Sequence, residues 1–181
     1  MKAGILSDSH DERGLAEDAL GLFREEGVEV ILHLGDVCRP ETILALRDSG
    51  IPMIGVYGNN DYDKEGLQAV SGNGFHPGPH MPEIDGRKIL MAHSFDELQE
   101  RIGEGGKFDL ILFGHTHRPL TMRIGRALIL NPGEACGFLS GKPTCAVIDF
   151  DTMEASIREI RAGVADAAEL SGDDVVKPRN R

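Results

Sequence analysis

Leu110-Ile111-Leu112-Phe113-Gly114-His115-Thr116-His117 is the stretch of sequence that decides the fold. Its first four residues form a short apolar run, which is typical of a buried strand. Two histidines follow at positions i and i+2, in the segment that leaves this strand. The stretch therefore predicts a buried strand that presents two imidazoles near one point at its carboxyl end.

Four other segments repeat this order of an apolar strand followed by polar residues. The expected strands are residues 2–7 before Asp8-Ser9-His10, residues 28–34 before Gly35-Asp36, residues 52–57 before Gly58-Asn59-Asn60-Asp61, and residues 87–92 before His93. Open α/β sheets place their sites at the carboxyl ends of strands. The five segments together predict one site that is assembled from distant parts of the chain.

Helical patterns alternate with the strands in the first half of the chain. Apolar residues recur at helical spacing between residues 13 and 26, and Gly27 ends that helix. Pro40 opens a second helix, because proline is tolerated best in a first turn. A third, weaker helix is expected over residues 64–70. This βαβα order predicts parallel strands joined by right-handed crossovers.

The second half of the chain contains three expected hairpins and one further helix. The hairpins join residues 80–84 to 88–92 through Asp85-Gly86, residues 119–124 to 127–130 through Gly125-Arg126, and residues 144–150 to 154–161 through Asp151-Thr152-Met153. Ser94-Phe95-Asp96-Glu97 has the pattern of a capping box and opens a helix that runs to about Gly103. The residues alone predict a mixed αβ protein with two sheets packed face to face and helices outside.

Length and composition favour one domain in a reducing compartment. We expect a domain over residues 1–162 and an appendage over residues 163–181 that is a short helix or disordered. No apolar run approaches the ~18 residues of a membrane span, and the N-terminus turns polar at Ser7, so a cytoplasmic location is expected. The three cysteines form no C-x-x-C motif, and Cys38 stands two residues after Asp36, near the predicted site.

The charge of the chain limits its partners. Its net charge is −11 and it has no basic run, so its field disfavours long nucleic acids. A local cationic pocket could still bind one phosphate. Homo-oligomers are compatible with the sequence, which does not specify the number of subunits.

The polar residues at the strand ends form a mixed set of oxygen and nitrogen donors. The set comprises the carboxylates of Asp8 and Asp36, the amide of Asn59, and the imidazoles of His10, His93, His115 and His117. Such donors without thiolate suit Mn²⁺, Fe or Zn²⁺ better than Cu(I) or an iron–sulfur cluster. Seven ligands exceed the need of one tetrahedral zinc. Shared between two ions ~3.5–4 Å apart, with one bridging carboxylate, they fit a two-metal hydrolase.

These ordered motifs resemble those of the calcineurin-like metallophosphoesterases, and most of all their small single-domain YfcE-like phosphodiesterase branch. The resemblance spans residues 1 to about 160 and includes the turn Asn131-Pro132-Gly133. It implies the metallophosphoesterase fold, a four-layer αββα sandwich of two mixed sheets with outer helices. It also implies two divalent ions, with Mn²⁺ as first choice and Fe, Ni²⁺ or Zn²⁺ as alternatives. One ion would be held by Asp8, His10, Asp36 and His117, and the other by Asp36, Asn59, His93 and His115, with Asp36 bridging.

The activity implied by the resemblance is hydrolysis of a small phosphodiester through in-line attack of a bridging hydroxide on phosphorus. Two divalent ions, two carboxylates and one hydroxide leave a net charge of about +1 in the pocket, which suits a phosphate. Asn60 and Asp61 are the candidate catalytic residues, with Asp61 expected to hydrogen-bond a metal ligand. Many family members carry a histidine where this chain has Asn60. An amide cannot transfer a proton, and a lost general acid typically costs ~10²–10⁴-fold, so activated diesters should react best.

Two other readings of the sequence stay open. The fold can serve as a protein-binding scaffold with little or no catalysis, as the small metallophosphoesterase-fold subunit of retromer does. A structural protein whose histidines only pack is the third hypothesis. Among the remaining histidines, His33 is expected to pack within the sheet. His76 and His80 lie in a Gly/Pro-rich segment and are expected to be exposed, with a role as substitute acid open.

Overall fold

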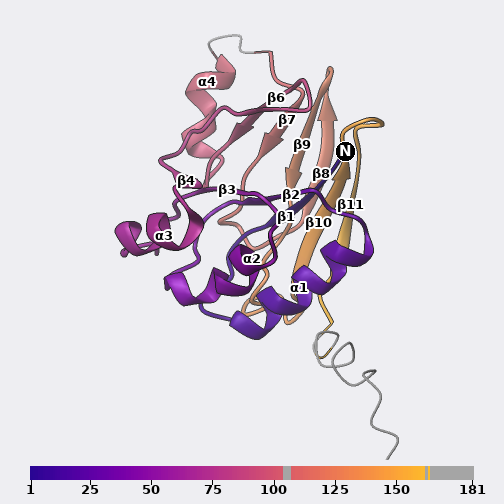
Figure 1. Cartoon of the computed structure of the whole chain (residues 1–181). Helices are drawn as coiled ribbons and strands as arrows, with labels where there is room; N and C mark the ends of the chain where they lie inside the picture. The colour runs from indigo at the N-terminus through magenta and orange to yellow at the C-terminus, as the bar shows by residue number, and fades with distance from the viewer. Residues whose placement is uncertain (104–106, 162, 164–181) are drawn as a thin grey trace, which may run out of the picture.

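The structure is a computed structural model that describes residues 1–103, 107–161 and 163. Two mixed β-sheets pack face to face in it, and helices cover their outer sides (Figure 1). This arrangement confirms the predicted αββα sandwich. Apart from Gly163, the expected appendage over residues 163–181 lies outside the described residues.

The first sheet has six strands in the order β11-β10-β1-β2-β3-β4. Their bounds are β1 Lys2–Leu6, β2 Val30–His33, β3 Met53–Val56, β4 Phe75–His76, β10 Thr144–Asp149 and β11 Glu154–Glu159. Strands β1 to β4 run parallel, and β10 pairs antiparallel with both β1 and β11. The parallel half therefore has all its carboxyl ends on one edge of the sandwich.

The second sheet has five strands in the order β5-β6-β7-β9-β8. Their bounds are β5 Glu83–Ile84, β6 Arg87–Met91, β7 Leu110–Leu112, β8 Leu120–Ile124 and β9 Ala127–Asn131. The central strands β6, β7 and β9 are parallel, while β5 and β8 pair antiparallel at the two edges. The predicted hairpins supply these edge strands.

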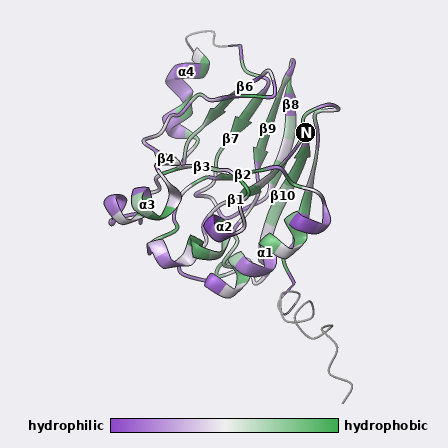
Figure 2. Cartoon of the chain, viewed as in Figure 1, coloured by the Kyte–Doolittle hydropathy of each residue, from purple (hydrophilic) through white to green (hydrophobic). Residues whose placement is uncertain are grey.

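Apolar side chains fill the space between the sheets and the space under the helices. The inner layer includes Ile5, Leu32, Met91 and Leu112, which are all fully buried. Figure 2 shows the apolar strands inside and the polar faces of the helices outside. Four helical segments cover the first sheet, namely α1 Arg13–Glu25, the 3-10 turn η1 Pro40–Ile43, α2 Leu44–Asp48 and α3 Lys64–Ser71. The turn η2 Asp96–Leu98 and α4 Gln99–Gly103 lie along the second sheet, where Leu98 packs on its strands.

The structure corrects two details of the sequence predictions. The segment around His76 is a strand, β4, and the rings of His76 and His80 are half-buried and stacked with centroids 4.0 Å apart. Their expected exposure is therefore wrong, because β4 pairs with β3 and His80 forms an isolated β-bridge with Met91 of β6. The helices after Pro40 and Ser94 both begin as 3-10 turns.

One further local prediction agrees with the structure in part and another agrees fully. Ser94 donates to the Glu97 carboxylate through both its backbone N–H and its hydroxyl, which is half of a capping box, but the turn η2 follows Phe95 and has no side-chain cap. His33 is fully buried in β2. Among the described residues, none of the helices combines the length and the apolar character that crossing a bilayer requires.

Candidate metal centre

Strand register brings the predicted site residues to one edge of the sandwich. In the first sheet Leu6 is level with His33, and His33 is level with Gly55. In the second sheet Met91 is level with Leu112, and Leu112 with Leu130. The loops that leave these strands carry all seven predicted ligands. The loops of the two sheets therefore face each other across this edge.

Backbone strain concentrates in these loops. Five of the seven predicted ligands have left-handed backbone, namely Asp8 (φ 54°), His10 (φ 40°), Asp36 (φ 55°), His115 (φ 62°) and His117 (φ 57°). Non-glycine residues rarely adopt this conformation, and such residues cluster at functional sites. This left-handed backbone directs the ligand side chains, and it costs conformational free energy. Packing alone does not explain why the loops bear that cost.

Two glycines let the loops approach each other closely. A Cβ at Gly58 would collide with the carboxylate of Asp36, and one at Gly114 would collide with the hydroxyl of Ser7. Glycine is the residue that permits such contact. The Gly-Asn-Asn-Asp and Gly-His-Thr-His segments therefore need their glycines for the approach of the loops as well as for the turn.

One group of donor atoms gathers around Asp8. Its Oδ1 lies 3.3 Å from His117 Nε2 and 3.8 Å from His10 Nε2. His10 Nε2 is in turn 3.7 Å from Asp36 Oδ2. Asp8 Oδ1 and His10 Nε2 are two of the three buried side-chain polar atoms that lack a hydrogen-bond partner within the described part of the chain. Buried polar atoms are seldom left unpaired, so a missing cation is a natural partner for both.

A second group gathers around His93. Its Nε2 lies 3.0 Å from Asn59 Oδ1, 3.2 Å from His115 Nδ1 and 3.4 Å from Asp36 Oδ2. Donors bound to one cation at about 2.1 Å are about 3.0–3.4 Å apart when their bond angles are about 90–110°. The separations fit that range. Asp36 Oδ2 belongs to both groups, as the predicted bridging carboxylate should.

The two aspartates differ in electrostatics because their neighbours differ. Burial raises the pKa of Asp8, although the Ser7 hydroxyl and nearby histidines oppose this shift. Burial also acts to raise the pKa of Asp36, but hydrogen bonds from His93 and Asn60 outweigh it and lower that pKa. Burial lowers the pKa of His93, yet its contact with Asp36 prevails and raises the value to about 9. In the metal-free protein, a proton on His93 therefore partly offsets the charge of Asp36.

The candidate catalytic residues, Asn60 and Asp61, hydrogen-bond Asp36, the residue with the predicted bridging carboxylate. Asn60 donates from its backbone N–H to Asp36 Oδ1 and from its side-chain amide to Asp36 Oδ2, both at 2.8 Å. Buried Asp61 accepts from the backbone N–H groups of Asp36, Cys38 and Gly58 at 2.7–3.0 Å. Asp61 therefore fastens the two ligand loops together. Cys38 lies beside the site, with its sulfur 3.4 Å from His10 Nδ1.

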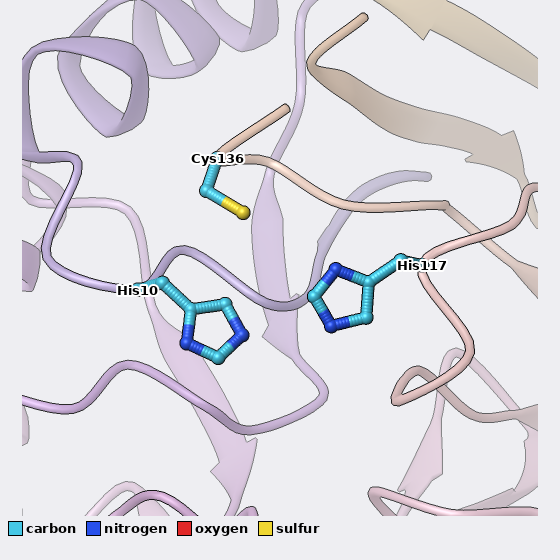
Figure 3. A group of neighbouring side chains, drawn as sticks. All are labelled: His10, His117 and Cys136. Carbon is cyan, nitrogen blue, oxygen red and sulfur yellow. The ribbon is translucent and has the colours of Figure 1, made fainter. Parts of the chain in front are cut away.

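Sequence reasoning missed two residues that lie against the site. Glu134 is fully buried, and its Oε2 is 2.6 Å from His117 Nδ1. Burial acts to raise the pKa of Glu134, but hydrogen bonds from His117 and Ser140 outweigh it and lower the value to about 2. Figure 3 shows the sulfur of Cys136 directed towards the space between His10 and His117. Both residues follow β9, so the pattern of polar residues directly after an apolar strand could have pointed to them.

A cleft of about 380 Å³ opens beside the second group of donors. Its lining includes Asn59, His93 and His115 together with Tyr57, Lys64 and Glu97. The Lys64 ammonium lies 5.2 Å from the centre of the Tyr57 ring. The second group of donors is therefore reachable from solvent through a cleft lined by one cationic and one anionic side chain.

Several known proteins resemble this chain over most of its length. Residues 1–153 match the calcineurin-like phosphoesterase superfamily domain. The protein named phosphodiesterase MJ0936 from Methanocaldococcus jannaschii is 32% identical over 159 residues, which cover 85% of this chain and 96% of that protein. The protein named phosphodiesterase YfcE from Escherichia coli is 23% identical over 175 residues, covering 84% of this chain and 90% of that protein.

Solved structures agree with this assignment. A structure described as a novel archaeal phosphodiesterase has a TM-score of 0.78 and 31% identity, covering 88% of this chain and 99% of its own. Vacuolar protein sorting 29 from Cryptosporidium parvum has a TM-score of 0.63 over 87% of this chain and 95% of its own, at 20% identity, which shows a shared fold alone. With the match over residues 1–153, the chain belongs to the calcineurin-like phosphoesterase superfamily.

Proposed function

We propose that the protein is a phosphodiesterase that works with two divalent cations, Mn²⁺ being the first choice. The observation that carries this proposal is the convergence of seven oxygen and nitrogen donors into two groups that share Asp36. Two buried atoms in these groups, Asp8 Oδ1 and His10 Nε2, have no partner among the described residues. The relatives named phosphodiesterase support the same reaction class.

Asp8, His10, Asp36 and His117 would hold one cation, and Asp36, Asn59, His93 and His115 the other. When bound, the cations supply an activated water at neutral pH and stabilise the entering and leaving oxygens of an in-line displacement. The side chains of this protein fix where these events occur. His93 donates its Nδ1–H to the carbonyl oxygen of Leu34 at 2.8 Å, which leaves Nε2 as the ligand atom.

Asn60 steadies the shared carboxylate by donating to both oxygens of Asp36. The second N–H of its side-chain amide can donate to a phosphoryl oxygen of the substrate. An amide transfers no proton, however, so the leaving group must depart without a general acid at this position. Substrates with acidic leaving groups, such as aryl diesters, should therefore react faster than alkyl monoesters.

The cleft beside Asn59, His93 and His115 would receive one ester arm of the substrate. Its volume of about 380 Å³ exceeds the need of a bare phosphate and falls in the range of small-molecule sites. Lys64 offers that arm a positive charge. A small diester with two organic groups fits this arrangement.

The test is hydrolysis of bis(p-nitrophenyl) phosphate and p-nitrophenyl phosphate by protein stripped with a chelator, before and after addition of Mn²⁺. We expect turnover only with the metal, and roughly tenfold or more faster for the diester, because both esters release p-nitrophenolate and only the diester has a second arm to fill the cleft. Asp48→Asn, at an exposed position at the end of α2, serves as a control with normal activity. Protein that binds two cations and hydrolyses neither ester would contradict the proposal and favour a binding scaffold.

A further inference from the structure

Glu134 is a buried carboxylate that the proposed reaction does not use. Its side chain is fully buried, directly after the turn Asn131-Pro132-Gly133. The following residues are tied to the end of β1, because Ala135 N–H donates to Ser7 O at 2.9 Å and Cys136 N–H donates to Asp8 O at 3.1 Å. The backbone therefore holds Glu134 in a fixed position relative to Asp8.

The carboxylate of Glu134 determines which nitrogen of His117 is free. A carboxylate only accepts hydrogen bonds, so the 2.6 Å contact requires the hydrogen on His117 Nδ1. In the neutral ring His117 Nε2 then carries no hydrogen and can bind a cation; it lies 3.3 Å from Asp8 Oδ1, inside the first group of donors. A carboxylate behind a metal-bound histidine orients the ring and strengthens the nitrogen as a ligand.

The same carboxylate also holds a surface loop. The backbone N–H groups of Leu139 and Ser140 donate to Glu134 Oε1 at 2.9 Å and 2.5 Å. The neighbouring residue in this loop, Phe138, stacks on His10 with ring centroids 6.2 Å apart, and His10 stacks on His117 at 5.3 Å. Glu134 therefore touches a predicted ligand and the loop that covers another one.

We propose that Glu134 is a positioning residue for the cation held by Asp8, His10, Asp36 and His117, and that it ties the Phe138–Ser140 loop to that same position. The inference rests on the proposed function, since it takes His117 as a metal ligand. The inference adds the carboxylate of Glu134, which touches no substrate and acts through the imidazole of His117. In the second group of donors, His93 donates instead to the neutral carbonyl oxygen of Leu34.

The first experiment is calorimetric titration of the metal-free full chain with Mn²⁺. Glu134→Gln should weaken one of the two binding steps by about 10–100-fold and leave the other within about twofold. His10→Ala and His115→Ala assign each step to its group of donors, and Glu154→Gln, at an exposed position on β11, is the matched control. Equal weakening of both steps, as general loosening of the fold would give, or no weakening, would overturn the proposal.

A second measurement needs no change at Glu134, so it survives if Glu134→Gln does not fold. Long-range ¹H–¹⁵N spectra of the wild-type protein loaded with Zn²⁺ report which nitrogen of each histidine carries the hydrogen, and His117→Gln assigns the signal. We expect the hydrogen of His117 on Nδ1. A hydrogen on Nε2 would exclude the positioning role.

The loop is tested with a fluorescent reporter, because the chain contains no tryptophan. Phe138→Trp places a single indole beside His10, where bound Mn²⁺ should quench its emission. With Glu134→Gln added and Mn²⁺ saturating, the quenching should fall at least twofold as the loop is released. Unchanged quenching would remove the loop from the proposal.

Diester turnover of Glu134→Gln, measured in parallel, separates this inference from the proposed function. Normal turnover together with unaltered metal binding would contradict this inference and leave the proposed function intact.

Discussion

His93 and His117 occupy opposite sides of the site, and the two sides are supported differently. Each ring donates through Nδ1, His93 to the carbonyl oxygen of Leu34 at 2.8 Å and His117 to the carboxylate of Glu134 at 2.6 Å. The negative charge that balances His93 is Asp36, which is itself a predicted ligand. The carboxylate that accepts from His117 lies behind the ring and is not a predicted ligand. Loss of metal should therefore disturb the His93 side more strongly than the His117 side.

Replacing Asp36, the carboxylate that both groups of donors share, should have the largest effect on the site. Asp36→Asn removes a charged donor from both groups, so we expect diester turnover to fall at least ~10³-fold, or about 4 kcal/mol. Metal analysis should find at most one cation per chain. Asp48→Asn is the control, and near-normal turnover by Asp36→Asn would mean that Asp36 does not bridge.

The pH dependence of the free energy of unfolding tests the His93 side of the site. The pKa of His93 is raised from 6.5 to about 9 in the folded, metal-free protein. A raised pKa contributes stability that is complete below about pH 6.5 and is lost as pH rises through 9. The loss should reach about 3 kcal/mol by urea unfolding in chelator. His93→Gln should remove most of this slope, and a wild-type profile that stays flat from pH 6.5 to 9 would refute the assignment.

His33 gives a smaller dependence in the opposite direction, although it lies behind the ligand loops, with Ser9 and Gly35 as its hydrogen-bond partners. Its burial lowers the pKa from 6.5 to about 3. The unfolded chain therefore binds the proton first, so stability falls as pH drops below 6.5, by about 2 kcal/mol at pH 5. Carboxylates with a lowered pKa, such as Glu134, contribute only below about pH 4.5. Urea unfolding of His33→Gln at pH 5 and 6.5 should give nearly equal free energies, unlike the wild type.

Asn60→His tests the smallest of the expected effects, which is that of the missing proton donor at position 60. An imidazole at this position should raise turnover of an alkyl monoester such as glycerol phosphate, whose basic leaving group needs a proton, by up to about tenfold, or about 1.4 kcal/mol. Bis(p-nitrophenyl) phosphate, whose leaving group is acidic, should change less. The ratio of the two rates, measured at several pH values, is the readout, and an unchanged ratio would count against our account of Asn60.

The pattern of polar residues directly after apolar strands was sufficient to predict most of the fold and to name residues that the structure brings together. Short apolar runs followed by Asp, Asn or His are local patterns, and parallel pairing then aligns their ends. Strand β4 was missed because two residues, Phe75 and His76, carry no periodicity and become a strand only by pairing with β3. Glu134 was missed because its partners are His117 and two loop amides, and their distances depend on how residues 131–140 fold back.

The left-handed backbone of the ligand loops has a consequence for protein engineering. His115 is exposed and has φ 62°, a conformation that glycine adopts without strain. A library screened for heat resistance alone would therefore be expected to enrich His115→Gly and similar replacements that relax the chain while erasing a donor. Directed evolution of this scaffold should accordingly select each round on catalysis and treat melting temperature as a secondary criterion.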